Sequence, residues 1–242
     1  MSKQLKKEFL ENFMGNTILT IADKNYSLWP LAPWLCLKAV NMPFKEVLIR
    51  FGQSDTREKM LKYAMTGRVP ALHHNGLEIW DSLAICEYIA DLHPSHCLWP
   101  TTINARAKAR TFAAEMHATG GSFPGAPRHI IYSLDTNVRR RTERVVPTGD
   151  VQQSINYLIN RWRLLLDEFG GSGGFLFNQF TIADAMSAHL VNRFVTYDIE
   201  LPDDIKNYCE NLRSFTPLTQ WINEAEKEDW ELISAEIDVS KL

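Results

Sequence analysis

The chain of 242 residues has little cysteine and no long apolar run. Its cysteines, at positions 36, 86, 97 and 209, show neither the close pairing of a zinc site nor the density of a secreted disulfide scaffold. No segment is apolar over the length needed to span a bilayer, and the first 16 residues lack the apolar stretch of a signal peptide. We therefore expect reduced thiols and a cytoplasmic protein.

An excess of charge of either sign is also missing. The chain has 26 Lys and Arg against 29 Asp and Glu, a formal net charge of −3. Such a balance produces no general field that would attract nucleic acid or an anionic membrane, so we expect neither as a partner. The hydrophobic share of 45% and charged share of 23% are ordinary for a globular protein with a sizeable core.

Strand and helix patterns alternate in the first part of the chain. The short apolar runs 17–22 and 44–49 are typical of buried strands. Apolar residues at helical spacing begin at Leu31, and the charged segment 56–65 favours a second helix that Gly67 ends. The order so far is strand, helix, strand, helix.

A hairpin follows. Two short strand patterns, 71–74 and 77–80, flank Asn75-Gly76, the dipeptide that best provides the two positive φ angles of a type I′ turn. These strands should therefore be antiparallel. A further apolar-periodic helix begins at Ser82.

This order of elements predicts a thioredoxin-like domain, of βαβ-ββα type, over residues 17–93. We expect an N-terminal extension at 1–16 and a linker at 94–101. An all-helical bundle domain should fill 102–242, so that the fold class is α/β plus all-α. Its main helical patterns lie at 103–119, 150–169, 182–196 and 203–228.

The segment from Asn25 to Pro30 places a hydroxyl, that of Ser27, at the turn between the first strand and the first helix. Free backbone N–H groups and the positive end of a helix dipole favour an anion at such a turn. A hydrogen bond to a thiolate is worth about 1.5 to 3 kcal/mol, close to the roughly 2.7 kcal/mol needed to lower a thiol pKa by two units. Tyr26, or the backbone alone, is the alternative, and a plain helix cap is the simplest interpretation of Ser27.

A second segment lies about forty residues further on. Arg68-Val69-Pro70 precedes the hairpin, and Asp81-Ser82 begins the helix after it. Exposed backbone at the first and caps at the second suit a small peptide-like ligand. An ordinary turn and an ordinary helix cap are the alternatives, and Arg68 either pairs with a ligand carboxylate or stays solvated.

In this order and spacing, the two segments resemble glutathione transferases. The first resembles the Asn-Tyr-Ser-Ser-Trp-Ser-Leu-Arg-Pro-Trp pattern of some bacterial members and the serine-rich turn of the zeta-like class, with Leu28 and Ala32 replacing a serine and the arginine. The absence of a cysteine at the turn argues against a disulfide reductase and against the cysteine-dependent transferase classes.

The resemblance implies a role for each site residue. Val69, before a cis-proline Pro70, would pair through its backbone with the cysteinyl part of glutathione. Asp81 and Ser82 would hold the γ-glutamyl carboxylate, and Ser27 would stabilise the thiolate. Residues expected at the wall for the second substrate are Phe112, Met116, Phe123, Arg128 and Tyr132.

The resemblance also implies the activity and the assembly. We expect a cytosolic transferase that uses glutathione as co-substrate, binds no metal, and conjugates the thiolate to a small hydrophobic electrophile. A homodimer should join segments 56–65 and 83–90 of one subunit to 103–119 of the other. The alternatives are a zeta-like isomerase that uses glutathione to turn a cis double bond, and a non-catalytic interaction module.

Three further motifs favour structural roles. Thr181 and Asp184 have the spacing of a capping box. The arginines at 139–141 and Arg144 favour a solvated helix face or a mobile loop, with contact to an anionic partner as the alternative. His93, His96 and Cys97 are closely spaced but lack a fourth metal ligand.

Overall fold

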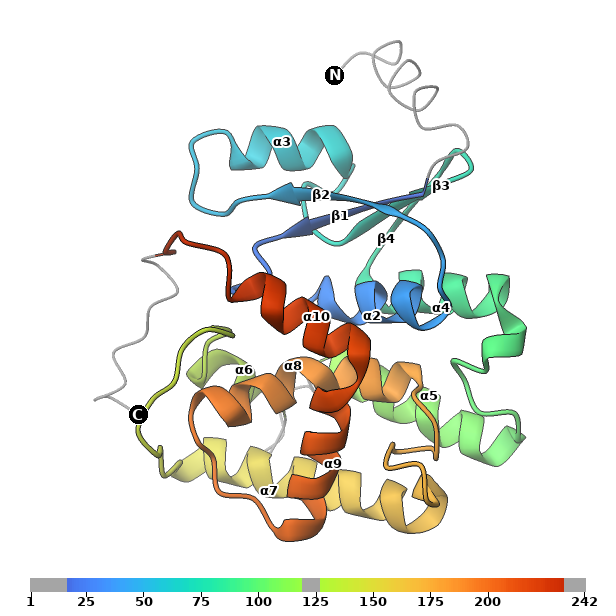
Figure 1. Cartoon of the computed structure of the whole chain (residues 1–242), viewed down its shortest axis with the longest axis vertical. Coiled ribbons are helices and arrows are strands. Elements are labelled where there is room, and N and C mark those ends of the chain that lie inside the picture. The colour runs from blue at the N-terminus through green and yellow to red at the C-terminus, as the bar shows by residue number, and fades with distance from the viewer. Residues whose placement is uncertain (1–16, 119–126, 233–242) are drawn as a thin grey trace.

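The computed structural model describes residues 17–118 and 127–232. Within these ranges, a four-stranded sheet with helices on both faces lies at one end of the molecule, and a group of helices forms the other end (Figure 1). The α/β plus all-α fold class is therefore confirmed. The expected extension at 1–16 lies outside the described residues.

The sheet has the order β2-β1-β3-β4. Its strands are β1 (Ile18–Ala22), β2 (Lys45–Ile49), β3 (Ala71–His74) and β4 (Leu77–Trp80). β1 is parallel to β2, and β3 is antiparallel to both β1 and β4. Every residue of β1 is buried, as its central position and covered faces require.

Asn75 and Gly76 connect β3 to β4 with φ angles of 49° and 81°. Both angles are positive, which confirms the turn chemistry expected from the sequence. Ala71 is paired with Trp80 at the far end of this hairpin. The residues just outside the pair, Pro70 and Asp81, therefore lie next to each other.

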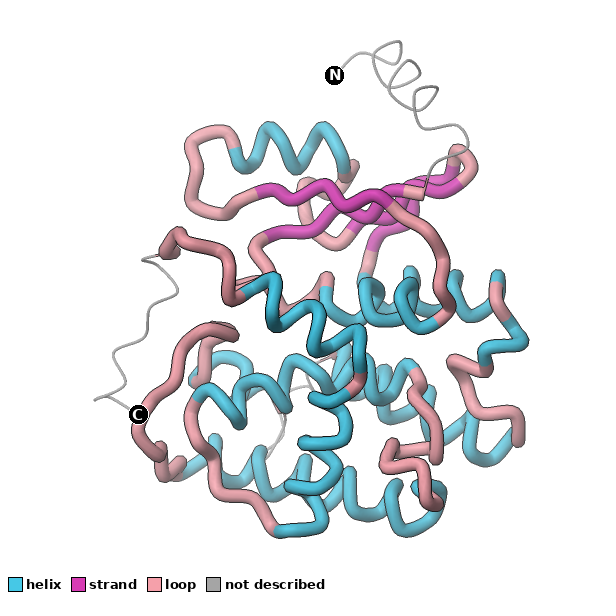
Figure 2. Tube along the Cα trace, viewed as in Figure 1, coloured by secondary structure: helices cyan, strands magenta, loops and turns pink. Residues whose placement is uncertain are grey.

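Helices cover both faces of the sheet (Figures 1 and 2). α2 (Leu31–Ala39) and α4 (Ser82–Leu92) lie on the face toward the other helices, and α3 (Thr56–Tyr63) lies on the opposite face. The apolar stripe of α2, including Trp34 and Leu35, is fully buried between the sheet and the helical region. One continuous hydrophobic core consequently joins the two parts.

α8 is the central element of the helical region, and almost all of its residues are buried. Asp184 in its first turn accepts hydrogen bonds from the backbone N–H of Thr181 at 2.9 Å and of Leu176 at 3.0 Å. The capping box predicted from the sequence is thus present. The elements of this region are η1 (Pro94–His96), α5 (Ile103–His117), α6 (Arg128–Ser133), α7 (Gly149–Leu165), η2 (Leu166–Gly170), α8 (Ile182–Thr196), α9 (Asp203–Ser214) and α10 (Thr216–Ala225).

Two features of this region differ from the sequence-based expectation. The single helix expected over 203–228 is two helices, because Phe215 has an extended ψ of 119° and Pro217 cannot continue the hydrogen bonding of the preceding turn. The short helix α6 was not expected, since six residues carry too little apolar periodicity to be recognised. Among the described residues, no helix has the length and apolar character to cross a membrane.

Candidate functional site

The five residues predicted to bind glutathione line a single cavity of ≈ 440 Å³. The hairpin register explains this convergence, because it brings the segment before β3 beside the start of α4. The peptide bond between Val69 and Pro70 is cis, as the resemblance implied. The complete lining is Trp29, Thr66, Arg68, Val69, Pro70, Trp80, Asp81, Ser82 and His117.

Asp81 is the most constrained residue of the cavity. Its φ of 79° lies in the left-handed region that side chains with a Cβ rarely adopt. Its Oδ1 accepts hydrogen bonds from the N–H groups of Leu83 at 3.0 Å and Ala84 at 3.2 Å, which caps α4. Its Oδ2 lies 2.7 Å from Nε2 of His117. The carboxylate is thus held by two elements at once.

Ser82 begins α4 and is 3% exposed, with its surface at the cavity. Arg68 is exposed at the rim, where its guanidinium can reach a carboxylate. Val69 is half-buried and borders the same space. A backbone edge, a hydroxyl and a cation therefore face one small cavity.

Four lining residues were missed by the sequence analysis. Trp29 is part of the recognised turn motif, and Trp80 directly precedes Asp81. Both could therefore have been predicted from the site residues beside them in the sequence. Thr66 lies in an ordinary loop. His117 ends α5, where no local pattern marks it, because only the packing of α5 against α4 brings it to the cavity.

Ser27 occupies a different environment from the one expected. It is 7% exposed and is not among the residues that line the cavity. Ser27 lies in the turn between β1 and α2, as expected, but α2 begins at Leu31 with Pro30 as its N-cap, so Ser27 does not cap this helix. Its backbone N–H instead donates to the carbonyl oxygen of Asp23 at 2.8 Å.

A C-terminal strap, defined here as residues 224–232, packs on the turn that contains Ser27. The carboxylate of Glu228 accepts hydrogen bonds from the backbone N–H groups of Lys24 at 2.7 Å and Asn25 at 3.0 Å. Trp230 donates its indole N–H to Asp23. Burial, and then the charge of Asp23, raise the pKa of Glu228 despite these hydrogen bonds.

Arg139 joins the strap to the turn from the helical region. Its guanidinium donates to the carbonyl oxygens of Glu228 and Trp230 and, at 3.3 Å, to the hydroxyl of Tyr26. Its backbone N–H donates to the side chain of Asn25 at 2.8 Å. Tyr26, the alternative to Ser27, is therefore engaged away from the cavity.

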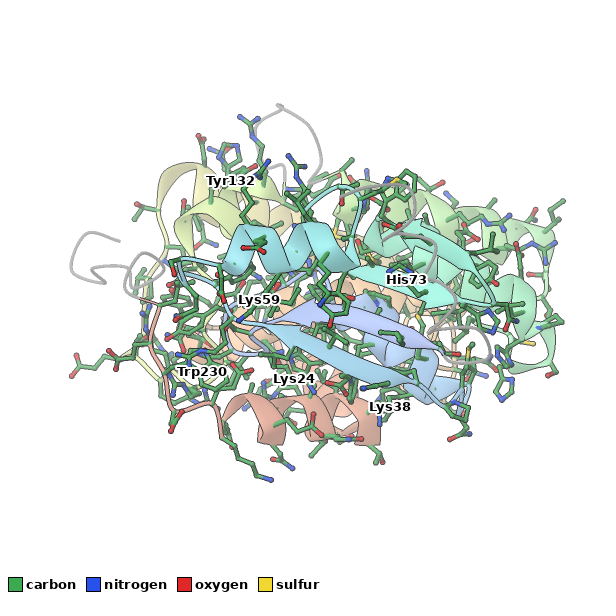
Figure 3. The ribbon with its side chains drawn as sticks, turned by 90° about the horizontal axis from the view of Figure 1, so that it is seen from above. Lys24, Lys38, Lys59, His73, Tyr132 and Trp230 are labelled. Carbon is green, nitrogen blue, oxygen red and sulfur yellow. The ribbon has the colours of Figure 1, made fainter. Side chains whose placement is uncertain are left out.

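Lys24 adds further contacts between the strap and the turn from Asp23 to Ser27; we call these contacts together the seal. It is 5% exposed and lies over the rings of Trp34 and Trp221, at 5.1 and 5.2 Å from their centroids. Its Nζ pairs with Glu46 at 2.6 Å and with Glu224. Figure 3 shows Lys24 and Trp230 on the side of the sheet next to α10.

Four of the five residues expected at the second-substrate wall lie in the described part of the chain, and none of these four lines the cavity. Phe112 and Met116 are 3% and 1% exposed because they lie on the face of α5 that packs into the core. Arg128 begins α6, and Tyr132 is 77% exposed, on the opposite side from α10 in Figure 3. Phe123 lies outside the described residues.

The arginines after position 138 have partners within the chain. Besides the contacts of Arg139, Arg140 pairs with Asp135 at 3.1 Å, and Arg144 pairs with Asp198 at 3.1 Å. In the described ranges, no three His, Cys, Asp or Glu side chains gather as a possible metal site.

Comparison with known proteins agrees with the fold. Residues 21–91 match the model of the glutathione S-transferase N-terminal domain. No curated protein sequence matches the chain. Three similar solved structures are, by name, glutathione transferases or a homolog of them.

A glutathione transferase homolog from Burkholderia GL BGR1, solved with bound glutathione, has 21% identity, a TM-score of 0.61, and coverage of 87% of this chain and 97% of that chain. A glutathione S-transferase from the Antarctic clam Laternula elliptica has 17% identity, a TM-score of 0.65, and coverage of 89% and 96%. The Tau class enzyme of mango, Mangifera indica, has 16% identity, a TM-score of 0.64, and coverage of 88% and 94%. The chain thus has a glutathione S-transferase N-terminal domain and the overall fold of glutathione transferases.

Proposed function

We propose that this protein is a glutathione transferase that binds glutathione in the cavity beside the Val69-Pro70 peptide. The observation that carries the proposal is the convergence of Val69, Asp81 and Ser82 on one cavity, within a region that matches the family's N-terminal domain. A structural neighbour was solved with glutathione bound, which supports glutathione as the ligand.

The cysteinyl and γ-glutamyl parts of the tripeptide each have a suitable group in the cavity. The backbone N–H and C=O of Val69 pair with the cysteinyl part, as an added strand would. The α-ammonium of the γ-glutamyl part meets the carboxylate of Asp81, and its carboxylate meets Ser82 and the guanidinium of Arg68. The cavity volume of ≈ 440 Å³ suits a ligand of this size.

The proposed reaction is conjugation of the thiolate to a hydrophobic electrophile. The thiol proton passes to solvent, a sulfur–carbon bond forms, and a leaving group departs from the carbon or a strained ring opens. Ser27 is proposed to stabilise the thiolate, since it lies two residues before Trp29, which lines the cavity. Its hydrogen bond lowers the thiol pKa by favouring the charged form.

Calorimetry with glutathione tests the binding step, with the dipeptide Cys-Gly, which lacks the γ-glutamyl part, as the matched control ligand. We expect binding of glutathione and at least tenfold weaker binding of the control, about the effect of one hydrogen bond to a charged group. Equal binding of the two ligands, or no binding of glutathione, contradicts the proposal. A panel of aryl halides, epoxides, peroxides and maleyl acids then identifies the reaction.

The sealed turn favours a second candidate function. Because Ser27 is buried and Tyr26 is engaged by Arg139, the protein has the features of a non-catalytic module that retains the binding cavity. Glutathione binding without turnover of any electrophile in the panel would establish this alternative. Rearrangement of a maleyl acid without conjugation would instead indicate a zeta-like isomerase.

We also propose that the protein forms a homodimer through the faces expected from the resemblance. Leu61 on α3, the neighbouring Met65 and Ile103 at the start of α5 are exposed apolar residues within the expected contact segments. Sedimentation equilibrium should give twice the chain mass of 27.8 kDa. Ile103→Glu should weaken the dimer, whereas Leu164→Glu, at an exposed apolar residue of α7 outside these segments, should not.

A further inference from the structure

The pair of Asp81 and His117 joins the two parts of the molecule at the cavity. Asp81 precedes α4 beside the sheet, and His117 ends α5 in the helical region. Both side chains line the cavity, and both remain accessible, with 43% and 31% exposure. A ligand in the cavity therefore meets this pair directly.

The hydrogen bonding of the pair is directional. An ionised carboxylate only accepts hydrogen bonds, so the contact of 2.7 Å requires Nε2 of His117 to carry the proton and donate it. Oδ1 of Asp81 is already used by the N–H groups of Leu83 and Ala84. One oxygen is thus oriented by α4 and the other by α5.

The imidazole of His117 is itself held in place. Trp29 packs edge-on against it, with ring centroids 5.8 Å apart, and Trp29 also lines the cavity. A ring fixed by a packing contact and a hydrogen bond holds the carboxylate in one orientation. Preorganisation of this kind improves binding because less freedom is lost when the ligand arrives.

We propose that His117 is a positioning residue for ligand recognition, and that its hydrogen bond orients Asp81 to receive the α-ammonium of a γ-glutamyl ligand. The inference rests on the proposed function. It makes the helical region a part of the glutathione site, and it predicts that His117 affects recognition of the ammonium group rather than the chemistry at sulfur.

The test compares the binding of two ligands at one fixed pH. The ligands are glutathione and glutaryl-cysteinyl-glycine, which differs only by lacking the α-amino group. The proteins are the wild type, His117→Ala, His117→Gln, and His96→Ala, a matched control at an exposed histidine that does not line the cavity.

We expect His117→Ala to raise the Kd for glutathione about tenfold, the scale of one hydrogen bond to a charged group. The Kd for the analogue should stay within about twofold of wild type, as should kcat at saturating glutathione for any electrophile that is turned over. His117→Gln should restore most of the affinity because its amide N–H can reach Asp81. His96→Ala should bind as the wild type does.

Three outcomes would overturn the inference while leaving the proposed function intact. They are an unchanged Kd in His117→Ala, a lower Kd, which would mean that the imidazole competes with the ammonium, and an equal loss for both ligands. Failure of the wild type to bind glutathione would overturn both proposals.

A double variant distinguishes an effect of His117 through Asp81 from a general effect of the substitution on folding. In an Asp81→Asn background the cap of α4 is retained, because asparagine is also a good N-cap, but the charge is lost. His117→Ala should then have no further effect on the glutathione Kd. An additive loss in the double variant would show that His117 does not act through Asp81 and would also overturn the inference.

Discussion

The cavity beside Pro70 and the turn from Asp23 to Ser27 lie next to neighbouring strands of the sheet, but they differ in how far their residues are exposed. At the cavity, Trp80 and Asp81 remain exposed. At the turn, every residue is buried, and backbone groups are hydrogen-bonded to Glu228 in the strap. The availability of a polar group therefore depends on what packs against it, and a turn with suitable residues can still be closed to a ligand.

The largest effect is expected from Glu228→Ala, which removes the contact between the strap and the turn and so makes the turn more accessible, as the cavity is. The substitution leaves two buried N–H groups, those of Lys24 and Asn25, without an acceptor, so we expect a loss of about 2 to 4 kcal/mol in the free energy of unfolding. Urea denaturation measures the loss. Glu226→Ala, at an exposed residue that pairs only with Arg141 among the ion pairs described, is the control and should cost under about 1 kcal/mol.

Hydrogen exchange separates opening of the turn from general destabilisation. The amides of Lys24 and Asn25 should exchange faster in Glu228→Ala while those of β3 stay protected. If both regions lost protection together, or if Glu226→Ala cost as much, the strap would not be a local seal.

Ser82→Ala tests whether a polar residue that lines the open cavity binds the ligand. Loss of a hydrogen bond to the ligand carboxylate should weaken glutathione binding by about 1.5 to 3 kcal/mol, since the acceptor is charged. Calorimetry gives the Kd, and Ser95→Ala, at an exposed residue away from the cavity, should leave it unchanged. Equal Kd values for wild type and Ser82→Ala would make Ser82 an ordinary first residue of α4.

Ser27→Ala tests whether the sealed turn takes part in the chemistry. We expect lower turnover with little change in glutathione Kd, because the proposed hydrogen bond of Ser27 is to the sulfur and not to the groups that hold the tripeptide. The thiol pKa in the complex should rise by about one to two units, or about 1.4 to 2.7 kcal/mol. Ultraviolet titration of the thiolate measures this, and an unchanged titration with full activity would favour Tyr26 or the backbone instead.

The smallest expected effect concerns the pH dependence of the seal. Burial works to raise the pKa of Glu224, but its hydrogen bonds with Lys24 and Gln220 and the charge of Lys24 lower it overall. A carboxyl with a lowered folded-state pKa stabilises the fold above its ordinary value of about 4.3, and this contribution is lost as pH falls through the folded value.

We therefore expect wild type to exceed Glu224→Gln by about 0.5 to 1 kcal/mol near neutral pH, a small figure because the carboxylate is 35% exposed. Urea unfolding at several pH values should show the difference shrinking as pH falls below the ordinary carboxyl value of about 4.3. Glu210→Gln, whose exposed carboxylate pairs with Lys206, is the control. A difference that grows as pH falls would contradict the lowered pKa.

Local sequence determined most of the elements and part of the candidate site. Asn75-Gly76 defines the hairpin turn, and the hairpin register brings Pro70 beside Asp81. These contacts join residues about ten positions apart, so short-range turn chemistry is sufficient to predict them. The places of Val69 and Ser82 at the cavity could therefore be predicted from the amino-acid sequence alone.

Only the tertiary structure decided the rest. The turn that contains Ser27 is hydrogen-bonded to a strap that follows it by about two hundred residues, and His117 reaches Asp81 from another helix. Neither contact has a local pattern, because each depends on how the helical region packs against the sheet. Residue type and spacing determine which groups can act at a turn or a cap, but long-range packing determines which of them a ligand can reach.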